Sequence, residues 1–154
     1  MTSAASRLAG LRGLLFDLDG VLTPTAEVHM RAWARTLSAV LAERGVAEPY
    51  SDADYFAYID GKPRLDGVRD VLASRGIALP EGAPDDHPAR DTVAGVGNRK
   101  NAAFAAEIAE NGVAAYPGSV AFLDAAIAAG LAVAVVSSSR NAEPVLRAAG
   151  LRDR

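Results

Sequence analysis

The chain has 154 residues, half of them hydrophobic, so it can form the core of one globular domain or of a small domain with an insertion. The formal net charge is -3 at pH 7 and the Lys and Arg residues are scattered, which argues against nucleic acid as a partner. Cysteine is absent, which excludes disulfides and thiolate metal sites and favours a cytoplasmic location, and no segment approaches the roughly 18 apolar residues of a membrane span.

The first predicted element is a strand near the N-terminus. Residues 13–18 form a short apolar run that ends abruptly at Asp17, Asp19 and Gly20. This pattern predicts a buried parallel strand that stops at a polar loop. In open α/β sheets ligands bind at the carboxyl ends of the strands, so this loop is the first place to look for chemistry.

Helices are predicted for most of the sequence that follows. Apolar residues recur at helical spacing, and each pattern stops at a glycine. About five helices are expected, four of them covering 30–41, 65–72, 104–108 and 120–127, and the last running from about residue 141 to Gly150. The segment Pro80–Pro88 is dense in Pro, Gly and Asp and predicts a surface loop.

A second apolar run, residues 131–136, predicts another parallel strand that ends at Ser137. About 110 mostly helical residues separate the two strands, whereas an ordinary crossover needs a dozen or more. We therefore predict an α/β Rossmann-like core interrupted by an inserted helical cap. The core is expected at 1–26 and 109–154, and the cap at 27–108.

Two carboxylates two positions apart at a strand tip suit phosphoryl transfer. Asp17 can attack phosphorus while Asp19 protonates the leaving oxygen and then activates the next acceptor. Such a reaction needs a hard cation, and Asp17 and Asp19 are suitable ligands for Mg²⁺. The alternative is that the two aspartates only end a strand in a turn; the apolar strand before them and Val-Leu-Thr after them favour the catalytic interpretation.

Ordered motifs along nearly the whole chain resemble the haloacid dehalogenase (HAD) superfamily, and its β-phosphoglucomutase branch in particular. The matching segments are Asp17-Leu18-Asp19-Gly20-Val21-Leu22-Thr23, Thr25-Ala26-Glu27-x-His29-x-x-Ala32-Trp33, Gly61-Lys62-x-Arg64, Arg99-Lys100-Asn101, Tyr116-Pro117-Gly118 and Val136-Ser137-Ser138-Ser139-Arg140-Asn141. The resemblance implies a HAD core with an α-helical cap.

For the core residues, the resemblance implies that Asp17 is the nucleophile and Asp19 the general acid/base. It places the loop after the second strand around the transferring phosphoryl group, with Ser137 and Asn141 as the main contacts and Ser138, Ser139 and Arg140 beside them. A Ser/Asn loop that opens a helix offers hydroxyl, amide and backbone N–H donors to an anion. The alternative for these residues is ordinary helix capping.

For the cap, the resemblance implies that Arg64, next to Gly61, binds the distal phosphate of the substrate through its planar guanidinium. Lys100 and His29 match residues that face the closed site, Thr25 matches a hinge position and Trp33 lines the cap; with Gly61 these residues are expected to contribute to substrate binding. The alternatives are a solvated surface arginine for Arg64, a structural histidine, a solvated lysine at a helix start, and core packing for Trp33. Pro24 stands where the motif often has Asp, which should stiffen the hinge.

The implied activity is Mg²⁺-dependent interconversion of β-glucose 1-phosphate and glucose 6-phosphate, through a phospho-aspartate and a bisphosphorylated intermediate. A sugar-phosphate phosphatase that uses the same residues stays open as an alternative, and so does a catalytically inactive fragment. The family's third motif, a lysine, and its fourth, an acidic pair, are expected after Arg154. We therefore expect a truncated gene product or fragment that holds only strands one and two of the core.

In this sheet the first strand is normally central, so its apolar backbone edge is expected to be open. An open edge of Gly-Leu-Leu-Phe invites pairing with another chain. We expect self-association through this edge, low stability, and a well-formed cap beside a poorly supported core. A sugar phosphate is the expected substrate partner.

Overall fold

A computed structural model describes residues 10–154 as two compact units. One unit, here called the core unit, contains the chain up to Ala26 together with Val113–Arg154. The other, here called the cap unit, contains Glu27–Gly112. The domain boundaries proposed from the sequence, with a cap at 27–108, stay a prediction.

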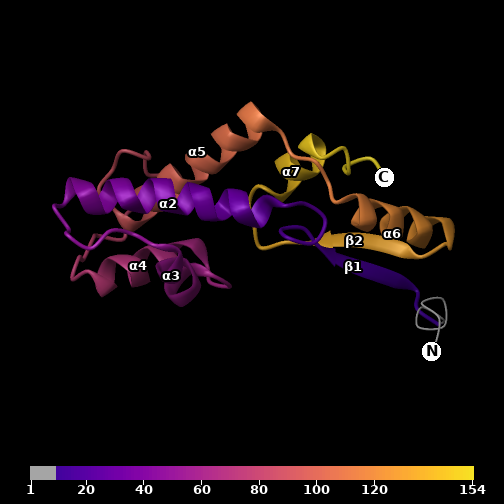
Figure 1. Cartoon of the computed structure of the whole chain (residues 1–154), viewed down its shortest axis with the longest axis horizontal. Helices are drawn as coiled ribbons and strands as arrows, with labels where there is room; N and C mark the ends of the chain where they lie inside the picture. The colour runs from indigo at the N-terminus through magenta and orange to yellow at the C-terminus, as the bar shows by residue number, and fades with distance from the viewer. Residues whose placement is uncertain (1–9) are drawn as a thin grey trace. The chain divides into compact units, whose positions relative to one another are not determined.

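The core unit has a two-stranded parallel sheet and two helices, as the mixed α/β prediction requires (Figure 1). Strand β1 (Gly13–Asp17) pairs in parallel with β2 (Ala132–Val136), and Asp17 lies opposite Val136. Helix α6 (Pro117–Ala128) lies against the strands, where the rings of Phe16 and Phe122 meet edge to face at 5.9 Å. Helix α7 (Ala142–Ala148) follows β2 and its polar loop.

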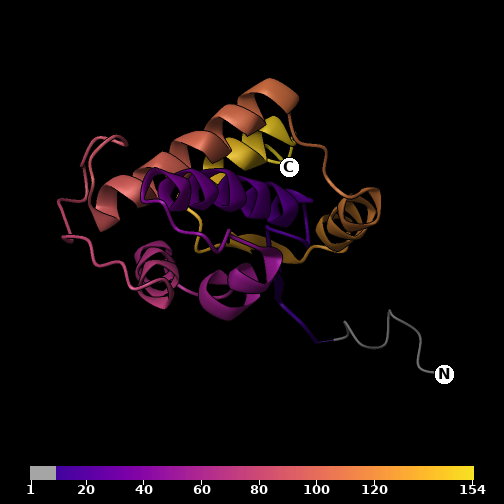
Figure 2. The same ribbon diagram turned by 60° about the vertical axis from the view of Figure 1, so that its left-hand side comes forward.

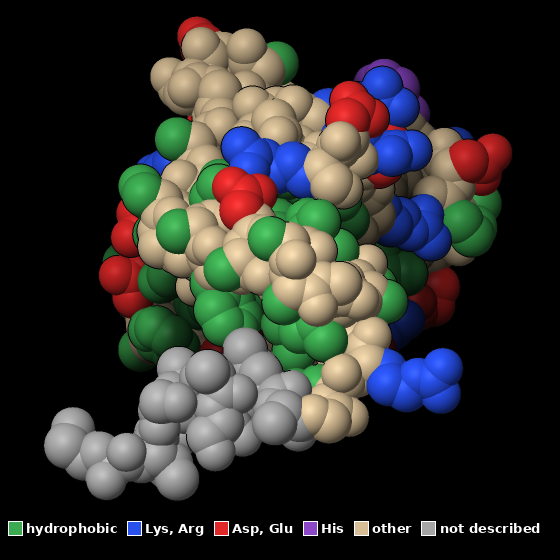
Figure 3. All heavy atoms as spheres, turned by 90° about the vertical axis from the view of Figure 1, so that its right-hand side faces the viewer, with side chains coloured by type: hydrophobic (Ala, Val, Ile, Leu, Met, Phe, Trp, Pro, Cys, Tyr) green, Lys and Arg blue, Asp and Glu red, His purple; other side chains and the backbone are tan. Residues whose placement is uncertain are grey.

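The prediction that the first strand is buried was wrong, since β1 is largely exposed, and β2 is largely exposed as well. Residues paired across a parallel ladder point to the same face, so Phe16 and Val135 lie on one face and Asp17 and Val136 on the other. Phe16 is buried, but Leu15 is 77% exposed and Val136 57% exposed. Hydrophobic side chains are accordingly visible on the surface in Figure 3. Within the described residues β1 pairs along one edge only, so its other edge is open.

The cap unit is helical. Its helices are α2 (Thr25–Glu43), which begins at the boundary between the units, α3 (Asp52–Asp54), the π-helix η1 (Tyr55–Ile59), α4 (Arg64–Ser74) and α5 (Val93–Asn111). Figure 2 shows α2 beside α5, and ion pairs join the two helices. Apolar side chains from α2, η1, α4 and α5 pack together in one core cluster: Trp33, Leu37, Val40, Leu41, Ile59, Val68, Val71, Leu72, Val93 and Val96.

The predicted helices are present, and they end at glycines with positive φ such as Gly45 (66°) and Gly76 (69°). The predicted loop Pro80–Pro88 is also present, without helix or strand. The sequence pattern missed α3 and η1, and it placed the start of α5 too late. No helix in the described part of the chain is long and apolar enough to cross a membrane.

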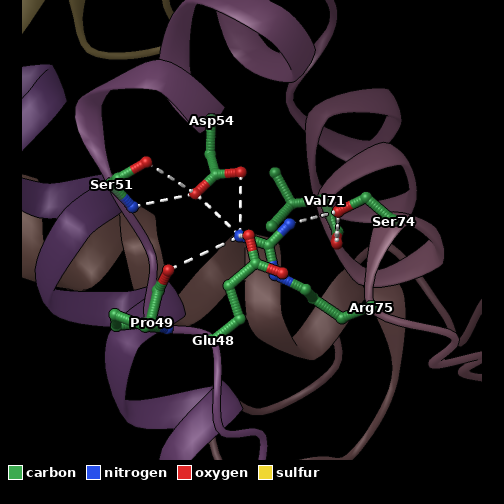
Figure 4. Close-up of polar contacts among 7 residues, drawn as sticks. All are labelled: Glu48, Pro49, Ser51, Asp54, Val71, Ser74 and Arg75. Carbon is green, nitrogen blue, oxygen red and sulfur yellow. Dashed lines mark hydrogen bonds and ion pairs between the residues drawn. The ribbon is translucent and has the colours of Figure 1, made fainter.

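A buried ion pair joins α3 to the end of α4 (Figure 4). One Arg75 guanidinium nitrogen donates to both carboxylate oxygens of Asp54, at 2.9 and 3.0 Å. The Ser51 backbone N–H and hydroxyl also donate to Asp54, at 2.8 and 3.1 Å. Burial alone would raise the pKa of Asp54, but the hydrogen bonds from Ser51 and Arg75 outweigh it and lower that pKa below its ordinary value of 3.8.

We expect Asp54→Asn to destabilise the chain by about 3 kcal/mol, because it leaves the Arg75 charge buried without its partner. Since the folded pKa is lowered, the stabilisation by Asp54 is present above about pH 4 and is lost as the pH falls through the folded pKa. Urea unfolding at pH 7 and at pH 3 checks this: the variant should lose less stability on acidification than the parent chain.

Glu48→Gln is the matched control, because Glu48 also faces Arg75 but at 3.5 Å and with a side chain that is 73% exposed. An exposed pair of this kind contributes on the order of 0–1 kcal/mol. Equal losses in the two variants would contradict the assignment of the stabilisation to Asp54.

Candidate active site

The first predicted site residue, Asp17, is the last residue of β1 and is exposed at the carboxyl end of the sheet. Its Oδ1 accepts a hydrogen bond from the Leu18 backbone N–H at 2.7 Å. The following backbone turns back on itself, because the Leu18 carbonyl accepts from the N–H groups of Val21, Leu22 and Thr23. The side chain of Asp17 therefore lies at the end of β1, directly before a hydrogen-bonded turn.

Asp19 is held inside this turn by two threonines. The Thr25 hydroxyl donates to Asp19 Oδ1 at 2.5 Å, and the Thr23 and Thr25 hydroxyls lie 2.8 Å apart. Both threonines are buried, and Thr23 also donates to the Leu18 carbonyl at 3.2 Å. Gly20, with φ of 82°, allows the tight turn between the aspartate and these threonines. The two carboxylates thus differ in surroundings: Asp17 is open, and Asp19 is fixed by a buried hydroxyl pair.

Sequence reasoning missed Thr23, and it placed Thr25 in the hinge as a substrate-binding residue without predicting its contact with Asp19. The usable signal was the position of two threonines four and six residues after Asp19, since short hydroxyl side chains near a carboxylate can fix its orientation.

The loop after β2 lies beside these carboxylates in the core unit. Ser137 Oγ is 3.5 Å from Asp19 Oδ2, at the outer limit of a hydrogen bond. Ser137 Oγ also accepts from the Ser139 N–H at 3.0 Å, and Ser139 Oγ accepts from the Asn141 N–H at 3.2 Å. Ser138 and Arg140 are exposed on the same loop. Asn141 is the N-cap residue of α7, but its side chain makes no capping bond to that helix.

An open hollow of about 450 Å³ lies at the carboxyl ends of the two strands. It is lined by Leu15, Phe16, Asp17, Val136, Ser137 and Ser138. The parallel register explains this grouping, because it places Asp17 opposite Val136 and hence next to the serine loop. One carboxylate and two hydroxyl side chains therefore face a space large enough for a phosphoryl group.

The donor set at this end of the sheet fits Mg²⁺. Asp17 and the backbone near Asp19 offer hard oxygen ligands, which Mg²⁺ prefers, and Mg²⁺ is usually held by one or two carboxylates with water and substrate phosphate completing the octahedron. Among residues 10–154 no group of three or more His, Cys, Asp or Glu side chains is arranged to hold a metal ion. These residues fit a site shared with substrate oxygens rather than an all-protein cage.

Two of the predicted cap residues meet inside the cap unit. Lys100 Nζ lies 2.5 Å from His29 Nδ1, and Lys100 is only 4% exposed. The ammonium lies 5.4 Å from the centre of the Trp33 ring and 5.0 Å from that of Phe104, on which the His29 ring stacks at 4.1 Å. The alternative of a solvated lysine at a helix start does not hold, because α5 begins at Val93 and Lys100 is buried within it; the predicted role of Lys100 in substrate binding stays a prediction.

Trp33 contributes to the core cluster, as the packing interpretation predicted, and it also contacts Lys100. The remaining predicted cap residues lie at the start of α4. Arg64 is the first residue of that helix and is half-buried, and Gly61 lies in the preceding turn with φ of 70°. Their neighbour Lys62 forms an ion pair with Asp70 at 2.6 Å.

Comparison with known proteins agrees with this geometry. A family model described as haloacid dehalogenase-like hydrolase matches residues 11–154. The β-phosphoglucomutases of Mycobacterium bovis and Mycobacterium tuberculosis are both 49% identical to the chain over 156 residues, which cover 95% of the chain and 60% of either relative. The chain thus spans about 60% of the length of these curated relatives.

Two solved structures extend the comparison. CbbY from Rhodobacter sphaeroides, in complex with xylulose-1,5-bisphosphate, is 25% identical with a TM-score of 0.66, over 91% of this chain and 57% of that one. β-Phosphoglucomutase from Clostridium difficile shares the fold, with a TM-score of 0.70 at 21% identity over 93% of this chain and 58% of that one. The family match over residues 11–154 shows that the chain belongs to the haloacid dehalogenase superfamily, and among curated proteins it is similar to β-phosphoglucomutases.

Proposed function

We propose that the protein carries the phospho-aspartate chemistry of a β-phosphoglucomutase, converting β-glucose 1-phosphate to glucose 6-phosphate through a bisphosphorylated intermediate. The observation that supports it most is the pair of carboxylates, Asp17 and Asp19, beside the serine loop at the carboxyl ends of β1 and β2. The 49% identity to the mycobacterial enzymes supports the choice of substrate.

The two carboxylates have surroundings that suit different roles. Asp17 is exposed and lines the hollow, so its carboxylate is the nucleophile that attacks the phosphorus of the donor. Asp19 is oriented by the Thr25 hydroxyl and exchanges a proton with the departing or entering sugar oxygen. Transfer to Asp17 forms a mixed anhydride, and the sugar oxygen leaves with the proton of Asp19.

Ser137 and Asn141 hold the transferring phosphoryl group through hydroxyl and amide donors, with Ser138, Ser139 and Arg140 around it. In the cap, Arg64 binds the phosphate that is not transferred, and Lys100 and His29 contact the sugar phosphate. Asp17 with the backbone near Asp19 would hold Mg²⁺, which would neutralise negative charge on the phosphoryl oxygens. Trp33 and Gly61 are further cap residues that we propose for substrate binding.

A phosphatase acting on sugar phosphates is the second candidate, favoured by the description of the matching family as a hydrolase. Both activities would use Asp17 and Asp19, and they differ in whether water or a sugar hydroxyl accepts the phosphoryl group from the aspartate. We further propose a cytoplasmic location and a sugar phosphate as the partner.

The deciding experiment is an assay of the purified chain with β-glucose 1-phosphate and a trace of the bisphosphate, with and without Mg²⁺. Formation of glucose 6-phosphate supports the mutase, and release of inorganic phosphate alone supports the phosphatase. If neither product forms although the bisphosphate binds, the chain is a catalytically inactive fragment and the proposal of activity is wrong.

Arg64→Ala tests the cap assignment. Loss of a charge-assisted hydrogen bond costs about 1.5–3 kcal/mol, so the dissociation constant for glucose 1,6-bisphosphate should rise about 10-fold to 100-fold. Acetyl phosphate has no distal phosphate, and its affinity should stay within about twofold, a free-energy change near 0.4 kcal/mol. NMR titration of the labelled chain measures both, and equal effects on the two ligands would reduce Arg64 to a surface residue.

A further inference from the structure

Helix α5 contains two buried glycines near its start, Gly95 and Gly97. Glycine inside a helix costs about 1 kcal/mol relative to alanine, so each position calls for a reason in the packing. At Gly95 a Cβ would collide with the carbonyl oxygen of Arg90, a residue in the segment just before the same helix. Gly97 is different, because what it faces is another helix.

A Cβ at Gly97 would lie 2.9 Å from Leu65 Cδ2 and 3.3 Å from Arg64 Cδ, in the first turn of α4. The alkyl stem of Arg64 therefore crosses α5 where that helix has no side chain. Cδ is the carbon that carries the guanidinium, so a shift of this atom moves the whole planar fork. Recognition of a phosphate by arginine depends on the alignment of that fork.

We propose that Gly97 is a positioning residue for Arg64, and through it a determinant of specificity for substrates with a second phosphate. This inference rests on the proposed role of Arg64. A methyl group at residue 97 displaces two neighbours with different consequences. Leu65 ends in methyl groups that can rotate away from the added methyl. A displacement of Arg64 Cδ instead moves the guanidinium, which then no longer aligns with the phosphate.

The test compares Gly97→Ala with the parent chain, with Arg64→Ala and with Gly67→Ala. Gly67 is the matched control because it is a buried glycine of α4 whose added Cβ would meet Ile59 Cγ1 at 3.3 Å instead of Arg64. The probes are glucose 1,6-bisphosphate and acetyl phosphate, titrated by NMR, and thermal unfolding is measured in parallel. Gly97→Ala should weaken the bisphosphate about fivefold, or about 1 kcal/mol, and leave acetyl phosphate unchanged.

The double variant Gly97→Ala with Leu65→Ala separates positioning from packing. Removing the Leu65 side chain relieves its clash, but the contact with Arg64 Cδ is retained, so the bisphosphate should still bind about fivefold more weakly than to Leu65→Ala alone. Gly67→Ala should change stability without changing the ratio of the two affinities.

The outcomes distinguish the two proposals. If Arg64→Ala leaves bisphosphate binding unchanged, the proposed role of Arg64 is wrong and the inference about Gly97 falls with it. If Arg64→Ala weakens binding while Gly97→Ala binds like the parent chain, or weakens both probes equally, only the inference about Gly97 is overturned.

Discussion

Asp17→Asn should abolish covalent phosphorylation of the protein. The amide nitrogen and oxygen of asparagine are poor nucleophiles toward phosphorus, so no mixed anhydride can form at this position. Because Asp17 is exposed and makes one short hydrogen bond to its neighbour's N–H, the substitution should leave the fold intact. The measurement is intact-mass spectrometry after incubation with Mg²⁺ and acetyl phosphate, which detects a gain of one phosphoryl group. Detection of a phosphorylated Asp17→Asn protein would contradict the assignment of Asp17 as the nucleophile.

Asp19→Asn should behave differently, because its carboxyl group moves protons. With a sugar bisphosphate as donor, the rate of phosphorylation should fall about 10²–10⁴-fold, the usual contribution of general acid/base catalysis. With acetyl phosphate the loss should be much smaller, since acetate leaves without being protonated. Asp124→Asn is a matched control in the core unit, where Asp124 pairs with Arg154 at the surface. A loss that is the same for both donors would show that Asp19 acts in some other way.

Most of the fold could be predicted from the sequence where one local signal dominates. The apolar runs before Asp17 and Ser137 gave both strands, and their shared polar ends gave the parallel arrangement. Glycines with positive φ marked the ends of the helices. The start of α5 was missed because Gly95 and Gly97 weaken the helical pattern there, and their reason is the close approach of other backbone and side chains. These contacts depend on the three-dimensional packing, so the sequence pattern does not show them.

The candidate site was predictable in its residue types but not in its contacts. Asp17 and Asp19 stand out by spacing, whereas the buried hydroxyl pair that orients Asp19 depends on how the turn folds back on the Leu18 carbonyl. In the cap, Lys100 was expected to face the closed site, with a solvated lysine at a helix start as the alternative. Its burial against aromatic rings follows from the packing of α5 on α2, which periodicity does not describe.

The second large effect is expected in the oligomeric state and the thermal stability of the chain. We expect the chain to self-associate through β1 and to unfold thermally below about 60 °C, within the usual mesophile range. Strand β1 is open along one edge within the described residues, it has no proline, lysine or bulge, and its Leu15 is 77% exposed. Natural edge strands are usually protected by charge, and lysine is the common choice. Leu15→Lys should therefore shift the chain toward a monomer in size-exclusion chromatography.

Phe56→Lys is the control for this prediction, since Phe56 is large and 65% exposed but lies in η1 of the cap unit, whose described residues form no strand. If association depends on the strand edge, Leu15→Lys reduces it and Phe56→Lys does not. If association instead comes from nonspecific contacts between exposed apolar side chains, the two variants reduce it equally. A monodisperse parent chain with cooperative unfolding above about 60 °C would contradict the prediction, because it would mean that a two-stranded parallel sheet with an exposed face is stable without pairing.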